Sequence, residues 1–376
     1  MLLADGALLA SAPGSFVRVA GALDVPALAD ASLATDAFEL SSNGYWTSAV
    51  SSEFAVNSEN SAILGGTLEI QPLATVVFSN GAIIGGSTFL YGGVLSADSL
   101  TVTGAGARLY GYGNIVGNTL NSATVVIIAD TQLVGDLVNE GTITIQNGTF
   151  TLTGSLAGGG AIIGDMSAPL ALPRSQTSAL FVAGDFAADE GARLVFPSSA
   201  WTLRLGGDFD VAVTTATDID LARAQVRFVG LGPEQTLEAL SVDLGPTADG
   251  LNPGTPGHYP LGTLQIGPQP ATVRVVDNHP NSPGSVATEA IYVDTLRILA
   301  GATLLSDGHN VYYRVLELDG SVDDPSRLIR VVGTLGDCDL DGDVDAADGA
   351  ELTACLAGPL ATPPLQSPGG CPCAAV

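Results

Sequence analysis

The chain has 376 residues, of which 46% are hydrophobic and only 14% charged, and it contains 47 glycines and 21 prolines. This composition is typical of a turn-rich all-β protein, and it excludes a disordered chain. The formal net charge is −27, because 39 Asp and Glu residues are set against 12 basic residues, all of them arginine. The absence of lysine excludes Schiff-base and P-loop lysine chemistry, and the acidity argues against nucleic acid or anionic membranes as partners.

No membrane span is expected, although the mean hydropathy is +0.37. A spanning helix needs about 18 consecutive apolar residues, and the densest apolar runs, such as 124–129, have only the length of a strand. The first residues, from Met1 to Asp5, lack the basic start of a secretion signal. This start suits either a cytosolic protein or a piece of a longer one. The cysteines described below favour the second alternative, so we predict a piece of a longer protein that is extracellular or attached to a cell surface.

The region from 57 to 165 is a series of short apolar segments separated by glycine or asparagine. We predict strands at 67–70, 75–78, 82–84 and 99–102. The alternation is clearest over 141–152, where the threonines would point outward. The side chains expected to point inward there are Ile143, Ile145, Phe150 and Leu152.

A loose repeat runs through the chain. A phrase of Gly or Asp, Thr or Ser, Leu or Ile, any residue, and Ile or Val begins at Gly66, Asp98, Gly141, Gly262 and Asp294. The first two and the last two are each offset by 32 residues, and the phrases 181–186 and 204–209 are offset by 23. Such periods are typical of solenoid turns, each of which buries its inner face only by stacking on its neighbours. We therefore predict a right-handed parallel β-solenoid (β-helix) with blocks at 1–173 and 174–333; a β-sandwich is the alternative.

Two irregular, proline-containing segments, 230–262 and 277–285, predict loop excursions from the solenoid. The three histidines, His258, His279 and His309, lie next to Gly, Pro or Asn and predict surface loops without the spacing of metal ligands. Motifs for a nucleophile elbow, a zinc helix or a phosphate-binding loop are missing from the sequence. No catalytic or cofactor-binding residue is therefore predicted, apart from a calcium site.

The calcium site is predicted from the run 336–348. An EF-hand loop supplies oxygen ligands from positions 1, 3, 5, 7, 9 and 12 and has glycine at position 6. Counting from Asp337 places Gly342 at position 6 and the apolar Val344 at position 8. The predicted calcium ligands are Asp337, Asp339, Asp341, Asp343, Asp345 and Asp348. A helix should follow, capped by Asp345 and ended by Gly358 and Pro359, which makes 334–376 a small EF-hand-like module.

All four cysteines lie within the last 39 residues: Cys338, Cys355, Cys371 and Cys373. Clustered cysteines beside a calcium loop suit an oxidising exterior. Four cysteines allow three disulfide pairings, of which we favour the pairing of Cys338 with Cys355.

At these residues the sequence resembles a dockerin type I repeat, including Asp at position 12 and the strand-like segment 331–335 where an EF-hand has its entering helix. With the Cys-Pro-Cys tail and the preceding β repeats, it is similar to the dockerin-ended, secreted solenoid proteins of planctomycete-type bacteria. The resemblance covers about 334–376. Only one calcium loop is present, and positions 10 and 11, which help cellulosomal dockerins to read a cohesin, are Ala346 and Ala347. The segments 310–313 and 320–322 are similar to repeats of autotransporter-like and pectin-lyase-like β-helix proteins.

The sequence therefore predicts a structural or adhesive solenoid without catalytic activity, attached to a cohesin-like or cell-surface protein through its calcium module and able to contact polysaccharide. The alternative is an extracellular polysaccharide lyase or glycoside hydrolase, which needs paired carboxylates. Candidate surface groups for that alternative are Asp208 with Asp210, Asp218 with Asp220, and Arg223 with Arg227, and sugar-stacking aromatics are Tyr110 with Tyr112 and Tyr312 with Tyr313.

Overall fold

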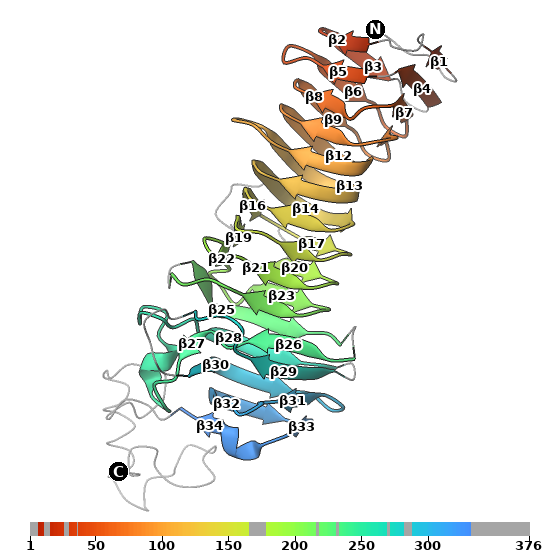
Figure 1. Ribbon diagram of the computed structural model, residues 1–376. Helices are drawn as coiled ribbons and strands as arrows, with labels where there is room; N and C mark the ends of the chain where they lie inside the picture. The colour runs from red at the N-terminus through yellow and green to blue at the C-terminus, as the bar shows by residue number, and fades with distance from the viewer. Residues whose placement is uncertain are drawn as a thin grey trace, which may run out of the picture.

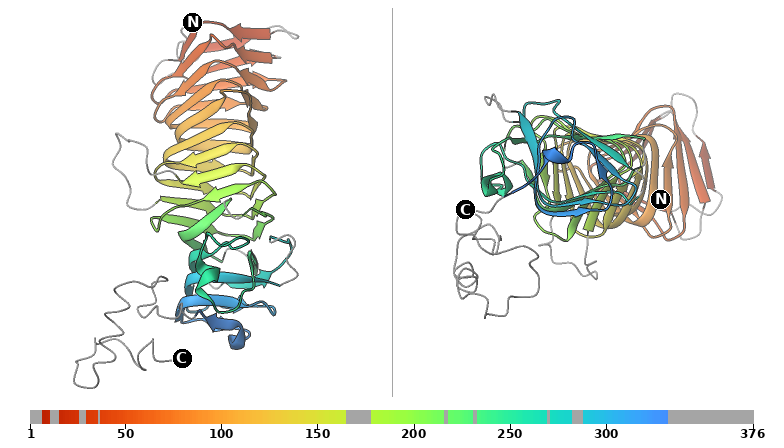
Figure 2. Two further views of the ribbon diagram at one scale, coloured as in Figure 1. Left: turned by 90° about the vertical axis from the view of Figure 1, so that its left-hand side faces the viewer. Right: turned by 90° about the horizontal axis from the view of Figure 1, so that it is seen from below.

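The computed structural model describes residues 7–10, 16–25, 30–35, 37–164, 178–215, 218–230, 233–268, 271–281 and 288–331. These residues form a stack of about 13 turns of short parallel strands (Figure 1). Viewed from below the stack, most of the turns lie over one another (Figure 2). The all-β parallel solenoid is therefore confirmed, and the β-sandwich alternative is wrong. The predicted calcium module lies outside the described residues.

Each turn contributes strands to three sheets, which we call faces A, B and C in chain order. Face A consists of β1 (Ala7–Ala10), β4 (Asp30–Thr35), β7 (Glu53–Ser58), β10 (Thr75–Phe78), β17 (Thr149–Leu152), β20 (Ser178–Val182) and β23 (Trp201–Leu205), with parts of longer strands. Face B consists of β2 (Phe16–Val19), β5 (Ala37–Leu40), β8 (Ala62–Leu64), β11 (Ala82–Ile84), β15 (Leu137–Asn139), β18 (Leu156–Ala157), β21 (Phe186–Ala188), β24 (Phe209–Val211), β26 (Gln235–Glu238), β29 (Thr272–Val276), β31 (Thr303–Leu305) and β33 (Ser321–Val322).

Face C consists of β3 (Ala22–Val25), β6 (Tyr45–Ser48), β9 (Thr67–Ile70), β16 (Thr142–Ile145), β19 (Ala161–Gly164), β22 (Arg193–Val195) and β34 (Leu328–Arg330). Several longer strands bend around a corner and serve more than one face: β12 (Ser87–Val102), β13 (Arg108–Asn121), β14 (Thr124–Val134), β25 (Ile219–Phe228), β28 (Leu261–Ile266), β30 (Glu289–Ile298) and β32 (Val311–Leu318). The short β27 (Ser241–Val242) pairs antiparallel with β30, and the 3-10 turns are η1 (Ala248–Leu251) and η2 (Pro325–Arg327). No helix among the described residues is long and apolar enough to cross a membrane.

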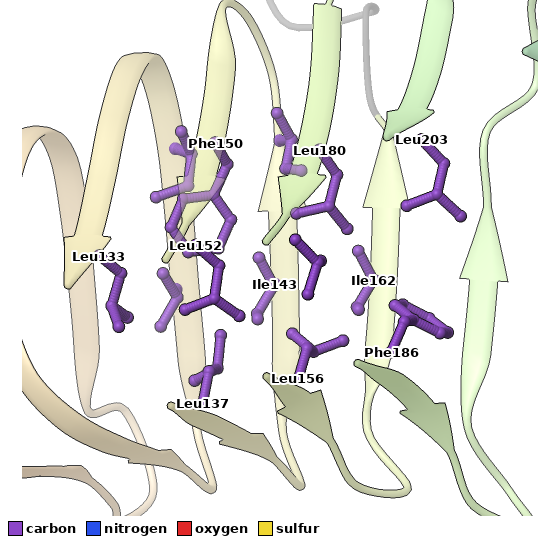
Figure 3. Close-up of a cluster of buried hydrophobic side chains, with 14 of the residues drawn as sticks. Leu133, Leu137, Ile143, Phe150, Leu152, Leu156, Ile162, Leu180, Phe186 and Leu203 are labelled. Atoms are coloured by element: carbon purple, nitrogen blue, oxygen red, sulfur yellow. The ribbon is translucent and has the colours of Figure 1, made fainter. Parts of the chain in front are cut away.

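The core is a continuous column of aliphatic and aromatic side chains. Because successive side chains on a strand point to opposite sides, every second residue faces the interior of the coil. The four residues predicted to point inward from β16 and β17 are all at most 1% exposed. Side chains of neighbouring turns lie over one another along the column (Figure 3). A single turn has no such interior, so each turn depends on its neighbours for stability.

The repeat offsets are confirmed in part. The 23-residue offset is one turn, because Phe181 is the register partner of Arg204 and Phe186 that of Phe209. The offset from 262 to 294 is also one turn, since the following strands β28 and β30 pair on face A. The offset from 66 to 98 is not, because β9 belongs to face C, where Thr67 pairs with Ser87, whereas residues 100–102 lie on face B. The predicted block boundary near 173 falls outside the described residues; β17 and β20 on either side of it pair directly.

Polar side chains satisfy backbone groups at the corners. At the corner that follows face B, the buried Asn121 donates through Nδ2 to Asn139 Oδ1 at 2.8 Å, and its own Oδ1 accepts from the backbone N–H of Ala123 at 3.1 Å. At the corner between faces A and B, Asp136 accepts from the N–H of Ser155, Asp185 from that of Asp208, and Asp208 from that of Thr236. Each side chain therefore ties its turn to the next one, where the sheet hydrogen bonds are interrupted.

The predicted loop excursion at 230–262 is correct only in part. Residues 235–238 form β26 and continue face B, and the excursion proper runs from about 243 to 260. It packs on two tyrosines of β30 and β32, Tyr292 and Tyr312, whose rings stack with centroids 4.6 Å apart. The Tyr292 hydroxyl donates to the carbonyl oxygen of Gly245 in the excursion at 2.8 Å. The Tyr312 hydroxyl donates to Asp243 Oδ1 at 2.6 Å. Tyr312 is 2% exposed, so this predicted sugar-stacking residue holds the excursion in place instead of facing solvent.

Candidate functional site

The six predicted calcium ligands, Asp337 to Asp348, lie outside the described residues, as do the four cysteines. Within the described ranges, no group of three or more His, Cys, Asp or Glu side chains is arranged to hold a metal ion. The calcium site therefore stays a prediction.

The acid and arginine pairs predicted for an enzyme do not converge. Asp208 lies at a corner, where its carboxylate accepts a backbone hydrogen bond from Thr236 at 2.6 Å. Asp220 belongs to the face C part of β25, whereas Arg227 belongs to the face A part of the same strand. A register shift separates the two parts, and the exposed Arg223 lies within it, whereas Arg227 lies in the regular pairing that follows.

Four aromatic side chains form the clearest candidate binding surface. Phe89 and Tyr91 on β12 alternate with buried residues, and so do Tyr110 and Tyr112 on β13, so all four point out from face C. The two strands pair in register, with Phe89 beside Tyr110 and Tyr91 beside Tyr112. We call these four residues the aromatic platform. Three of its rings pack together: the Phe89 centroid lies 6.2 Å from that of Tyr91 and 6.0 Å from that of Tyr110.

A glycine allows the platform to form. Gly111 lies between the two tyrosines of β13 and has φ of +136°, a conformation that residues with a side chain rarely adopt. A Cβ atom at this position would overlap the carbonyl oxygen of Leu90 on the neighbouring strand. Only glycine therefore lets β13 approach β12 closely enough for the two tyrosines to align with the aromatic residues of the previous turn.

Charged and polar groups surround the platform. The guanidinium carbon of Arg108 lies 5.7 Å from the Phe89 ring centroid, and its Nε donates to Ser87 Oγ at 3.4 Å. Partial burial, followed by the charges of Glu69 and Tyr110, raises the pKa of Tyr91, so its hydroxyl stays neutral at physiological pH. Flat rings edged by hydrogen-bonding groups suit the alternating C–H and hydroxyl surfaces of a sugar.

A second cluster contains an acid with a shifted pKa. Glu238, at the end of β26, is fully buried beneath residues 278–279, whose two backbone N–H groups donate to its Oε1 at 2.8 Å. Burial raises the pKa of Glu238 to about 8; the two hydrogen bonds oppose this rise, and the nearby Asp210 and Asp277 add to it. Beside it, His279 Nε2 lies 2.8 Å from Asp210 Oδ1. At pH 7 a carboxyl group with this pKa is largely protonated, and in the structure it lies beside the His279–Asp210 pair.

The histidine predictions are corrected at one position. His258 is 1% exposed, because the excursion folds back over it and places its ring 5.5 Å from that of Tyr292. Its buried Nδ1 has no hydrogen-bond partner among the described residues. His309 lies in a turn as predicted, with Nδ1 3.3 Å from the carbonyl oxygen of Glu289. His279 is partly exposed in the second excursion, but its pairing with Asp210 was not predicted.

Two of the four platform residues were predicted from the sequence. Tyr110 and Tyr112 were predicted as sugar-stacking residues, whereas Phe89 and Tyr91 were missed. The signal was present, because both pairs have aromatic residues two positions apart, and the pairs are separated by one turn of 21 residues. Glu238 was not predicted, because its burial depends on residues 40 positions later in the chain.

Comparison of the chain with models of known protein families gave no matching family. Comparisons with curated proteins and with solved structures gave no match either.

Proposed function

We propose that this chain is a non-catalytic, extracellular or cell-surface solenoid that adheres to polysaccharide through the aromatic platform and is attached to its partner by a calcium-binding dockerin-like segment at 334–376. About 13 turns at about 4.8 Å each make a rod of roughly 60 Å, which holds the platform away from the attached end. This is the arrangement that an adhesive spacer needs.

The aromatic platform is the observation that carries the proposal. Four large rings gathered on the outside of a sheet have no packing role there, because the core is already filled by the alternate residues of the same strands. All four rings are partly exposed, and solvent-accessible aromatic surface rimmed by polar groups marks binding sites on soluble proteins. A sheet surface of this kind accepts an extended ligand that lies along it, as a polysaccharide chain does.

The proposal that 334–376 binds calcium is supported by the oxygen ligands that its aspartates offer. Six aspartates at the alternating positions of an EF-hand loop supply the hard oxygen ligands that calcium prefers, and the glycine at position 6 suits the turn. A cohesin-like or other cell-surface protein is the proposed partner, with calcium as the cofactor that orders the segment.

A binding experiment tests the adhesive function. Affinity electrophoresis of the whole protein through gels containing xylan, laminarin, pectin or soluble cellulose derivatives should show retardation by at least one polymer. Replacing Tyr110 and Tyr112 together by alanine should weaken that binding about tenfold or more, because two stacking contacts are lost. Ile63, which is 46% exposed on face B, offers a matched control, since Ile63→Ala also removes exposed apolar surface. Equal binding by the tyrosine variant and the control would contradict the proposal.

The Glu238 cluster favours one alternative, a polysaccharide lyase or glycoside hydrolase. A protonated carboxyl group can act as a general acid, and Asp210 is a second carboxyl group on the neighbouring strand. Glu238 is fully buried, however, so a substrate could reach it only if residues 278–279 moved away. Mass spectrometry of the same polysaccharides after incubation with the protein would detect shortened products. Products that disappear in Glu238→Gln but persist in Asp208→Asn would establish the enzyme and replace the adhesive function. We expect no products.

A further inference from the structure

The other unusual surface of the molecule is a pair of arginines on face A. Arg204 on β23 and Arg227 on β25 are register partners on adjacent strands, and both side chains point outward. Adjacent strands are about 4.8 Å apart, so the two positive side chains leave the sheet side by side. Like charges directly opposite each other on neighbouring strands are destabilising.

Nothing among the described residues neutralises this pair. None of the ion pairs formed by described residues includes Arg204 or Arg227. The Nε atoms of both are shielded from solvent and lack a hydrogen-bond partner within the described part of the chain. Burial and then the charge of Arg204 lower the pKa of Arg227, which agrees with two guanidinium groups close enough to repel each other.

The same row of side chains shows how an arginine is ordinarily accommodated. Arg297 occupies the equivalent position two turns further on. Its Nε also lacks an aligned hydrogen bond to a described residue, but it lies 2.9 Å from Oε2 of its register partner Glu317, so the two side chains form an ion pair. In a chain with 39 acids and 12 arginines, an acidic neighbour is readily available. Arg204 and Arg227 have no such acidic neighbour among the described residues. Their two positive charges can therefore be neutralised by an anion bound from outside the protein.

An aromatic ring holds one arginine of the pair, and polar residues lie around both. The guanidinium carbon of Arg204 lies 4.7 Å from the ring centroid of Phe181, its register partner on the preceding turn. On the next turn, Gln265 is buried and accepts a hydrogen bond from Gln225 Nε2 at 3.3 Å. Thr202 and Gln225, two positions before the arginines, are also register partners and point outward. The surface thus combines two adjacent cations with uncharged hydrogen-bonding groups.

We infer that Arg204 and Arg227 form a binding site for the carboxylate or sulfate groups of an anionic polysaccharide. Guanidinium groups bind such oxyanions through two parallel hydrogen bonds. A sugar polymer with one charge per residue fits two cations in a polar surface. The net charge of −27 repels every polyanion, and it repels double-stranded DNA, with one charge per about 1.7 Å, more strongly than a polymer with one charge per sugar. The inference rests on the adhesive function proposed above and names its ligand class; the site lies on face A, apart from the aromatic platform on face C.

The test uses polygalacturonate and its fully methyl-esterified form, which has the same backbone without charge. Binding is measured by isothermal titration calorimetry of the whole protein in about 0.15 M salt with chelator, which screens the overall negative charge and removes calcium bridges. We expect polygalacturonate to bind and the ester to bind at least about tenfold more weakly. The variants Arg204→Gln and Arg227→Gln should each lose about tenfold in affinity.

Arg297→Gln is the matched control, because it removes an arginine of the same row that is already neutralised, and its affinity should stay unchanged. Dextran sulfate should also bind, because sulfate offers the same oxyanion oxygens, whereas uncharged dextran and monomeric galacturonate should bind at least about tenfold more weakly than the charged polymers. Equal binding of dextran and dextran sulfate would overturn the site for sulfate. Polymer binding that is retained in the two arginine variants, or lost equally in Arg297→Gln, would overturn the site. Single-stranded DNA binding as tightly as polygalacturonate would overturn the ligand class.

The two proposals fail separately. Binding of polymer that depends on Tyr110 and Tyr112 but not on Arg204 and Arg227 would leave the adhesive function standing without this site. Thermal unfolding gives a second measurement: polygalacturonate should raise the melting temperature of the wild type but not that of the double variant Arg204→Gln, Arg227→Gln.

Discussion

Glu238 is a single residue through which the fold should respond to pH. Its pKa is about 8 in the folded protein, against an ordinary value of 4.5. Between these two values the folded state holds one more proton than the unfolded state, so this residue lowers the free energy of unfolding by about 1.4 kcal/mol for each unit of rising pH. Its contribution is therefore complete below about pH 4.5 and is lost as the pH rises through about 8.

The variant Glu238→Gln isolates this effect. Glutamine can accept the same two backbone hydrogen bonds without a charge, so the variant should gain stability over the wild type as the pH rises. The gain between pH 5 and pH 9 should be roughly 3 to 5 kcal/mol. Urea denaturation of both proteins at several pH values measures it, and the exposed acids cancel because both proteins share them. Parallel stability curves across this range would show that Glu238 ionises normally in the folded protein.

Residue-scale features of this kind were the hardest to predict from sequence. Tyr110 and Tyr112 were identified because an outward position on a strand depends only on the local alternation. Glu238 and His258 were not, because each is covered by a segment whose path the local pattern does not determine. The pairing of Arg204 with Arg227 depends on register across an irregular turn, which the sequence leaves open.

At the scale of elements, the corners are held by side chains as much as by strands. Asn121 is fully buried, and its loss would leave both the Oδ1 of Asn139 and the N–H of Ala123 without their partner. Unsatisfied buried polar groups cost about 1–3 kcal/mol each. We predict that Asn121→Ala lowers the free energy of unfolding by about 2–4 kcal/mol, measured by urea denaturation.

Asn118 provides the comparison for this prediction. It also accepts a corner hydrogen bond, from the N–H of Asp136 at 3.0 Å, but its side chain is exposed, so water can replace it. Asn118→Ala should therefore cost less than about 1 kcal/mol. Similar losses in the two variants would mean that the burial of Asn121 adds nothing to the stability of the corner.

Elements were predicted well where the apolar alternation is local. The strands at 67–70, 75–78 and 82–84 have the predicted bounds, because a period of two identifies a half-buried strand without any tertiary information. The interpretation of the offset from 66 to 98 as one turn was wrong, because the same five-residue phrase can form a strand on any face of the coil. Which face a strand joins is determined by corner and loop lengths, and these vary from turn to turn.

The whole molecule is a one-dimensional stack, and this determines how far a local change spreads. Each turn contacts mainly the turns before and after it, so stability is a sum over turns and their interfaces. A change beyond the last described turn should leave the distant turns intact. The fold was predictable at this scale because the repeat, the composition and the lack of helical periodicity all indicate a solenoid.

Because distant turns are independent of one another, the loss of calcium should affect only the segment that binds it. The six aspartates from Asp337 to Asp348 repel one another until a divalent ion neutralises them, so we expect calcium to order the segment 334–376. Chelation should make that segment sensitive to limited proteolysis while the solenoid turns stay resistant. Far-UV circular dichroism should therefore change only slightly, because its β signal comes from the solenoid.

Variants of the loop separate calcium binding from a general effect of charge. Asp339→Asn with Asp341→Asn removes two proposed ligands and should leave the segment sensitive to protease even with calcium present. Replacing Asp319, an exposed acid of the solenoid, by asparagine removes charge without removing a proposed ligand and should keep the protection by calcium. If chelation leaves the proteolysis of 334–376 unchanged, the aspartates are not a calcium loop, and the attachment of the solenoid must depend on another part of the protein.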